Sequence, residues 1–172
     1  MKFYIRNKWV SLRGSSVIKD ENENDVFKVK GRIVSFSNKK DLLTMDDVLL
    51  YSIKTRIINI WGHKAFILDK DGNKIITVYR KVISLHDRYL IDAPFGKMEI
   101  TGNILGFDYH ISLEGKEIGH VSRKISLRDS FVLDTYTDFD YKLLIALVIA
   151  IDNISDNREQ SGPRIGIFRS GD

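Results

Sequence analysis

The chain has 172 residues, of which 43% are hydrophobic, so it is long enough to bury one core, and we expect a single domain. It contains no cysteine, which excludes disulfides and thiolate zinc sites, and a net charge of +4 is too small to indicate a nucleic-acid-binding protein. Residues 1–13 scatter four cations among apolar residues, which predicts no secretory signal and therefore a cytoplasmic protein.

A short pattern rich in β-branched residues recurs along the chain. Its copies occupy residues 29–36, 53–60 and 78–85, and a shorter fourth copy occupies residues 121–127. Each copy follows an apolar stretch and a polar turn. In one of these turns, Asp71-Gly72, glycine can adopt the positive φ that a tight hairpin turn requires. The repeated unit is therefore predicted to be a β-hairpin.

The segments between and beside these copies supply the remaining strands. Residues 89–105 predict one more strand pair, with a turn at Pro94, and residues 2–12 and 130–136 predict two outer strands. The total is about twelve antiparallel strands, and such a number protects its edges best by closing into a barrel.

An uninterrupted apolar run near the C-terminus, residues 143–151, predicts the one helix. A helix that is apolar on all sides must be surrounded on all sides, and this run is far shorter than the roughly 20 residues that cross a bilayer. We predict a helix over about residues 138–154, capped by Thr137 or Asp138, inside the barrel. Residues 1–154 then form one domain, and residues 155–172 are predicted to be a mobile tail.

Two stretches carry a family resemblance that covers most of the chain. The hairpin of residues 66–81 (FILDKDGNKIITVYRK) and the closing residues 134–136 and 140–152 resemble the LURP-one-related (LURF-one-related) family. The resemblance implies a mainly β, Tubby C-terminal-like fold: a closed antiparallel barrel of twelve strands around a central hydrophobic helix. It also implies a distant relationship to phospholipid scramblases and, at the level of fold alone, phosphoinositide binding.

Strand alternation predicts one candidate site. Cations at alternate positions of the repeated strands share the face opposite the apolar residues, and would form a basic stripe on the outer wall. The candidate phosphate-headgroup ligands are Lys30, Arg32, Lys54, Arg56, Lys81 and Lys124. The competing interpretation is an ordinary solvated surface whose acidic neighbours cancel the field.

Other polar residues are predicted to have structural roles, not catalytic or metal-binding ones. Arg80 and Arg123 have inward parity, so we expect them at bulges, near a rim, or paired with Asp140 or Asp152 at the ends of the helix. Asp69-Lys70-Asp71-Gly72 lacks the further ligands of a calcium loop and is interpreted as a hairpin turn.

The four histidines lie on separate units, and His110 is expected to face Gly119 across its hairpin, so no metal site is predicted. No cofactor is expected either. The chain also lacks a Gly-x-Ser-x-Gly elbow, a phosphate-binding Gly-rich loop and a cysteine nucleophile, which favours a non-enzymatic protein.

These observations predict a cytoplasmic protein that binds anionic phospholipid or phosphoinositide headgroups through its basic outer face and lies peripherally at the inner membrane surface when it does so. Two alternatives stay open. One is a structural or protein-interaction module without a lipid ligand. The other is scramblase-like lipid handling, which the resemblance suggests. Oligomeric state is left open.

Overall fold

The chain forms a β-barrel in the computed structural model, which describes residues 1–6, 15–34, 37–59, 62–83, 86–123 and 130–161. These residues contain twelve strands and one helix. In chain order the elements are β1 (Lys2–Arg6), β2 (Ser15–Lys19), β3 (Asp25–Val34), β4 (Ser37–Thr44), β5 (Leu49–Asn59), β6 (Gly62–Leu68), β7 (Lys74–Ile83), β8 (His86–Asp92), β9 (Met98–Asn103), β10 (Asp108–Leu113), β11 (Lys116–Arg123), β12 (Ser130–Thr135) and α1 (Tyr141–Ser161).

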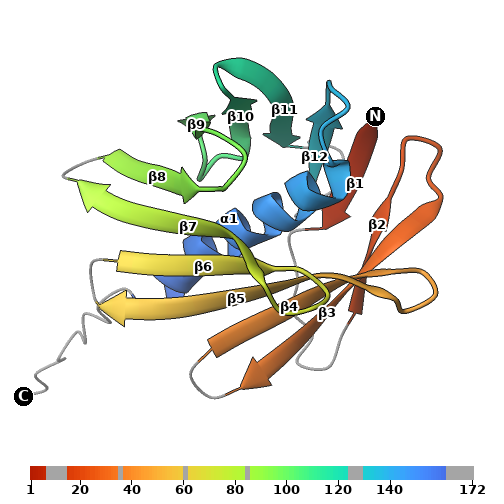
Figure 1. Cartoon of the computed structure of the whole chain (residues 1–172), viewed down its shortest axis with the longest axis horizontal. Coiled ribbons are helices and arrows are strands. Elements are labelled where there is room, and N and C mark those ends of the chain that lie inside the picture. Colours follow the sequence, from red (N-terminus) through yellow and green to blue (C-terminus); the bar gives the residue numbers. More distant parts are fainter. Residues whose placement is uncertain (7–14, 35–36, 60–61, 84–85, 124–129, 162–172) are drawn as a thin grey trace, which may run out of the picture.

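The strands close into one antiparallel barrel, as the sequence predicts (Figure 1). Each strand pairs with its neighbours in sequence, and β1 closes the ring by pairing with β12, where Phe3 lies opposite Leu133. Pairing is thinnest between β8 and β9, which meet at Ile91 and Met98, and between β1 and β2, which meet at Tyr4 and Lys19. Closure into a ring reduces the aggregation hazard of a large antiparallel sheet.

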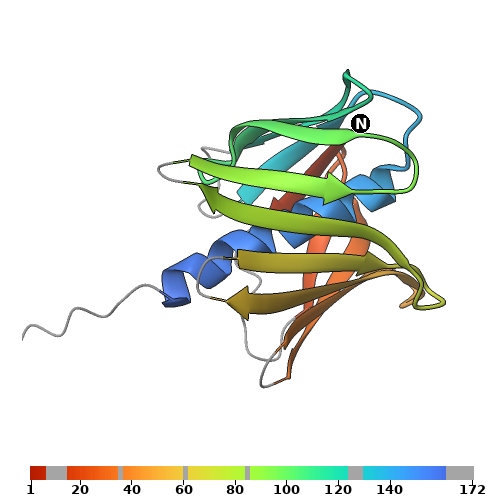
Figure 2. The ribbon, with the colours of Figure 1, turned by 60° about the vertical axis from the view of Figure 1, so that its left-hand side comes forward.

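The helix α1 runs through the middle of the barrel (Figures 1 and 2). Every residue from Leu143 to Ile151 is buried, with at most 6% of its surface exposed. The inward residues of the strands, such as Ile53 and Ile67, are fully buried in the same core. The prediction of a central hydrophobic helix is therefore confirmed.

The first turn of α1 differs from the prediction. Asp140, rather than Thr137 or Asp138, caps the helix: its carboxylate accepts a hydrogen bond from the Lys142 backbone N–H at 2.9 Å. The Tyr51 hydroxyl donates to the same carboxylate at 2.7 Å, which ties the start of the helix to β5. Partial burial, and then the hydrogen bond to this carboxylate, raise the pKa of Tyr51.

The other end of the helix lies beyond the predicted boundary. The helix ends at Ser161, seven residues after the predicted end at 154, so residues 155–161 continue the helix. Residues 162–172, the rest of the predicted tail, lie outside the described residues.

Polar side chains enter the barrel near the C-terminal half of α1. Lys40 on β4 has inward parity, and its Nζ lies 3.9 Å from Oδ2 of Asp152, whose side chain is 1% exposed. Arg80 is buried, as its inward parity predicts, whereas Arg123 is exposed at the end of β11, in accord with a rim position. Tyr89 on β8 shares a hydrogen bond of 2.9 Å with Ser155 of the helix. This end of the core is therefore held by polar contacts as well as by packing.

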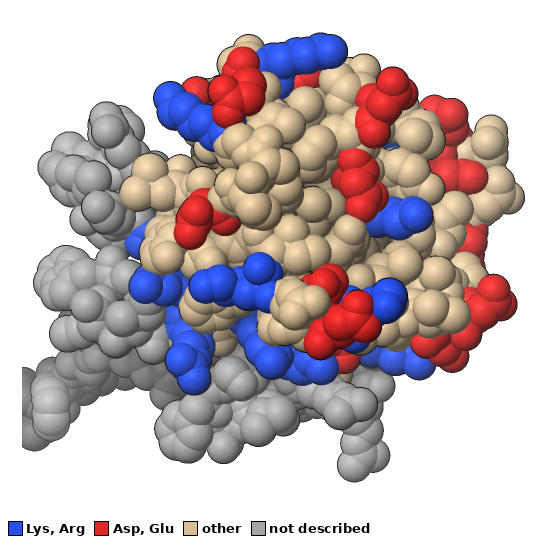
Figure 3. Space-filling model, viewed as in Figure 1, with Lys and Arg blue, Asp and Glu red and all other residues tan. Residues whose placement is uncertain are grey.

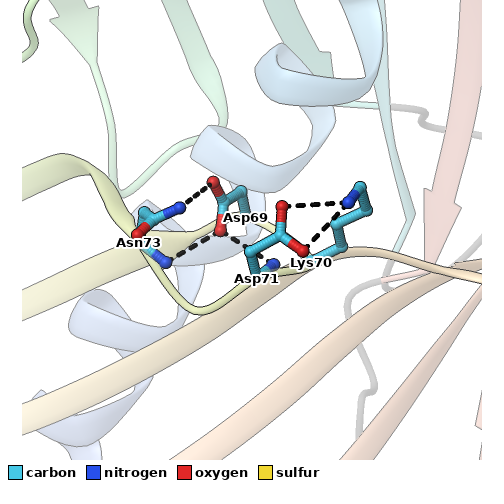
Figure 4. Close-up of polar contacts among 4 residues, drawn as sticks. All are labelled: Asp69, Lys70, Asp71 and Asn73. Carbon is cyan, nitrogen blue, oxygen red and sulfur yellow. Dashed lines mark hydrogen bonds and ion pairs between the residues drawn. The ribbon is translucent and has the colours of Figure 1, made fainter.

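The hairpin turn at Asp69 shows how local sequence builds the barrel (Figure 4). One carboxylate oxygen of Asp69 accepts the backbone N–H groups of Asp71 and Asn73, and the other accepts the Asn73 side-chain amide at 2.9 Å. These bonds lower the pKa of Asp69, with the Asn73 amide the largest cause. Asp20 and Asn24 repeat the arrangement between β2 and β3. The residues interpreted as a hairpin turn do form one.

Candidate anion-binding surface

The centre of the candidate surface is β5. Lys54 and Arg56 are exposed, whereas Ile53 and Thr55 beside them are buried. This alternation follows from the period of two residues in a strand, which sends successive side chains to opposite faces. Both cations therefore project from the outer wall, as the sequence predicts.

The register brings two further cations against them. Lys39 on β4 lies directly opposite Lys54, and Lys64 on β6 lies directly opposite Arg56. Directly opposed residues of an antiparallel pair share a face, with Cβ atoms about 4.5–5.5 Å apart. We call Lys39, Lys54, Arg56 and Lys64 the basic wall. In the lower half of Figure 3, where Figure 1 shows β5 and β6, Lys and Arg atoms form a row that has Asp and Glu atoms beside it toward the right.

An aromatic ring borders the basic wall. Tyr79 on β7 lies opposite Lys64, whose Nζ is 4.6 Å from the centroid of the Tyr79 ring. Such a cation–π contact holds the ammonium group against the wall without neutralising it. Lys64 therefore stays available to an anion from solvent.

Carboxylates compensate this wall only in part. Asp41 forms an ion pair with Lys39 at 3.2 Å and also accepts a hydrogen bond from Ser52 at 2.6 Å. Among the residues that the structure describes, no carboxylate forms an ion pair with Lys54, Arg56 or Lys64. Like charges placed directly opposite one another destabilise a sheet, and a bound anion would relieve that repulsion.

The other predicted ligands fall into two groups. Lys30 on β3 is exposed, but it shares the carboxylate of Asp47 with Lys28, at 2.8 and 3.3 Å, and these two cations lower the pKa of Asp47. Lys30 is thus drawn toward the turn between β4 and β5 instead of joining an uncompensated surface.

The side chains of the other three predicted ligands, Arg32, Lys81 and Lys124, lie outside the described residues. For two of them the backbone register is described: Arg32 lies opposite Lys39, and Lys81 lies opposite Gly62. Nothing of Lys124 is described. Their contribution to an anion site stays a prediction.

Sequence reasoning missed Lys39 and Lys64. Both lie on the strands between the repeated copies, so a comparison of the copies alone does not reveal them. These two lysines can be found from the pairing of β4 and β6 with β5. That pairing includes two shifts of register, one between Leu42 and Leu43 and one between Ile57 and Asn59.

No helix within the described ranges combines the length and apolarity needed to cross a membrane.

The comparisons with known proteins agree with this fold. The chain is 22% identical over 161 residues to the uncharacterised protein YxjI of Bacillus subtilis (strain 168), a match that covers 92% of this chain and 96% of that protein. The X-ray structure of an Arabidopsis thaliana protein superposes with a TM-score of 0.60 at 20% identity, covering 89% of this chain and 90% of that one. At such identity the likeness shows the fold alone. The family model described as LURP-one-related matches residues 1–152, and the chain therefore belongs to the LURP-one-related family.

Proposed function

We propose that this protein is a non-enzymatic reader of anionic phospholipid headgroups, which it binds through the basic wall. The observation that carries the proposal is the pairing of like charges across three strands: Lys39 opposite Lys54, and Arg56 opposite Lys64. A phosphate group between such pairs accepts hydrogen bonds from both cations and removes their repulsion. Arg56 adds the planar fork of donors that suits phosphate oxygens.

The expected affinity is modest. A lysine or arginine near an anionic membrane contributes about 1 kcal/mol, so four of them contribute about 4 kcal/mol. That free energy alone corresponds to a dissociation constant of about 1 mM, so attachment is reversible and peripheral. We propose that the protein is cytoplasmic and that a fraction of it is bound at the inner membrane surface. Because the Debye length is about 8 Å at physiological ionic strength, the binding should weaken with salt.

Liposome co-sedimentation tests the proposal. The purified protein is mixed with neutral phosphatidylcholine vesicles, or with vesicles that also contain phosphatidylglycerol or a phosphoinositide, at low and at physiological salt. The test variant replaces the basic wall with serine: Lys39→Ser, Lys54→Ser, Arg56→Ser and Lys64→Ser. The control variant removes the same charge elsewhere on the surface: Lys2→Ser, Lys70→Ser, Lys97→Ser and Lys116→Ser.

The wild type and the control variant should sediment with anionic vesicles and be released by salt, whereas the test variant should stay in the supernatant at both salt concentrations. Equal loss in the two variants would mean that net charge, rather than the basic wall, attracts the protein. Absence of wild-type binding to every anionic vesicle would refute the proposal and favour a protein-interaction module.

A further inference from the structure

Two histidines form a stacked pair on the opposite side of the barrel. His110 on β10 lies directly opposite His120 on β11, with ring centroids 4.3 Å apart and ring planes within 9° of parallel. The expectation that His110 faces Gly119 is wrong, because a bulge between Ile111 and Ser112 shifts the register of the hairpin. These strands lie five and six positions from β5 around the ring, so the pair is remote from the basic wall.

Each imidazole is oriented by its own carboxylate. His110 Nδ1 lies 2.9 Å from Glu117 Oε1, and His120 Nε2 lies 3.0 Å from Asp108 Oδ1. When a neutral imidazole donates the proton of one nitrogen to a carboxylate, its second nitrogen carries a lone pair. The second nitrogens here are Nε2 of His110 and Nδ1 of His120. A carboxylate that orients an imidazole in this way is the usual outer shell of a metal-binding histidine.

The surroundings of the pair attract cations and admit solvent. The side chains of His110 and His120 are 48% and 23% exposed. Besides Glu117 and Asp108, a third carboxylate, Asp134 on β12, lies directly opposite His120. Asp134 also forms an ion pair with Lys2 at 3.7 Å, so the carboxylates that contact the imidazoles are Glu117 and Asp108. Imidazole nitrogen selects transition metals over magnesium or calcium.

We propose that His110 and His120 form a surface site for a divalent transition-metal ion, such as Cu²⁺ or Zn²⁺. Two nitrogens bound to one tetrahedral ion lie roughly 3.3 Å apart, given metal–nitrogen distances of about 2.0–2.1 Å. The ring centroids are 4.3 Å apart, but the lone pairs lie in ring planes that are within 9° of parallel and so do not converge in the stacked arrangement. Binding of one ion therefore requires both rings to turn about their Cβ–Cγ bonds, a torsion that is broad for histidine. Within the described ranges no group of three or more His, Asp or Glu side chains is arranged to hold a metal, so the proposed site has two protein ligands.

Titration of the protein, prepared without a polyhistidine tag, with CuCl₂ or ZnCl₂ in a calorimeter tests this site. One ion should bind per chain at neutral pH. Irving–Williams ordering predicts tighter binding of Cu²⁺ than of Zn²⁺.

The substitutions His110→Gln and His120→Gln should each abolish saturable binding and leave the thermal midpoint of the metal-free protein nearly unchanged, since both side chains are outside the core. The matched controls His63→Gln and His86→Gln replace the other two histidines and should bind the ion like the wild type. Nitrogen hyperfine structure from two imidazoles is expected in the Cu²⁺ electron paramagnetic resonance spectrum. A dissociation constant above about 1 mM for both ions, or binding that survives both substitutions, would overturn the proposal.

Discussion

The central helix makes a quantitative prediction at Leu147, which lies in the middle of the buried run of α1 and is 0% exposed. Leu147→Ala removes three carbon atoms from a position enclosed by barrel walls on every side. A Leu→Ala substitution in a buried core lowers the free energy of unfolding by about 2 to 5 kcal/mol, and the loss rises with the volume of the cavity that remains. Because a closed, hydrogen-bonded barrel cannot collapse far onto the helix, we expect the upper part of that range, about 3–5 kcal/mol.

Urea denaturation followed by circular dichroism measures this loss. Since a domain is stable by about 5–15 kcal/mol in total, the variant should lose a large fraction of its free energy of unfolding. For a chain of this length the thermal midpoint should fall by roughly 6–20 °C. Leu105→Ala is the matched control, because this side chain is 51% exposed and its loss should cost little.

A more severe change at the same position sharpens the test. Leu147→Asp places an unpaired charge in the barrel and should abolish soluble folding. A loss below about 1 kcal/mol for Leu147→Ala, or a soluble Leu147→Asp protein with an unchanged thermal midpoint, would refute the packing of α1 as the centre of the core.

Two further predictions concern the turns and strand pairs. Gly102→Ala should destabilise the protein by about 1–3 kcal/mol, because Gly102 has a φ of +117° and an added Cβ would lie 2.6 Å from the Asp108 carbonyl oxygen. Gly31→Ala, whose Cβ would meet nothing within 4 Å, should be nearly neutral in the same urea titration. The pKa of Asp69 is lowered in the folded protein, so its contribution is present above the unfolded pKa of about 3.9 and is lost as the pH falls through the folded value. Asp69→Asn should therefore reduce the fall in stability between neutral and acidic pH, and a carboxyl titration by NMR that placed Asp69 at or above 3.8 would contradict this reasoning.

Local sequence was sufficient to predict the turns, the strands and the buried helix. The turn at Asp69 is built from side-chain and backbone groups within five residues, so its chemistry can be read directly from the residues 69–73. The burial of residues 143–151 likewise follows from their composition, since an all-apolar helix has no face that favours water. The number of strands and the closure of the barrel follow from the repeated hairpins and the cost of open edges.

The sites depend on which strands become neighbours and in what register. Lys39 and Lys64 join Lys54 and Arg56 only through pairing across β4, β5 and β6. The meeting of His110 and His120 depends on a single bulge, because a shift of one residue moves a side chain to the other face.

The cap of α1 depends on a contact with a distant part of the chain as well as on the local preference for a capping residue. Thr137, Asp138 and Asp140 all carry side chains that can cap a helix, and the contact of Tyr51 with Asp140 joins residues 89 positions apart. The sequence by itself therefore determined the hairpins, the buried helix and the closed barrel, because these follow from local turn chemistry and from the period of apolar residues. Only the tertiary structure decided the cap, the basic wall and the histidine pair, because each is made by residues that strand register brings together from distant parts of the chain.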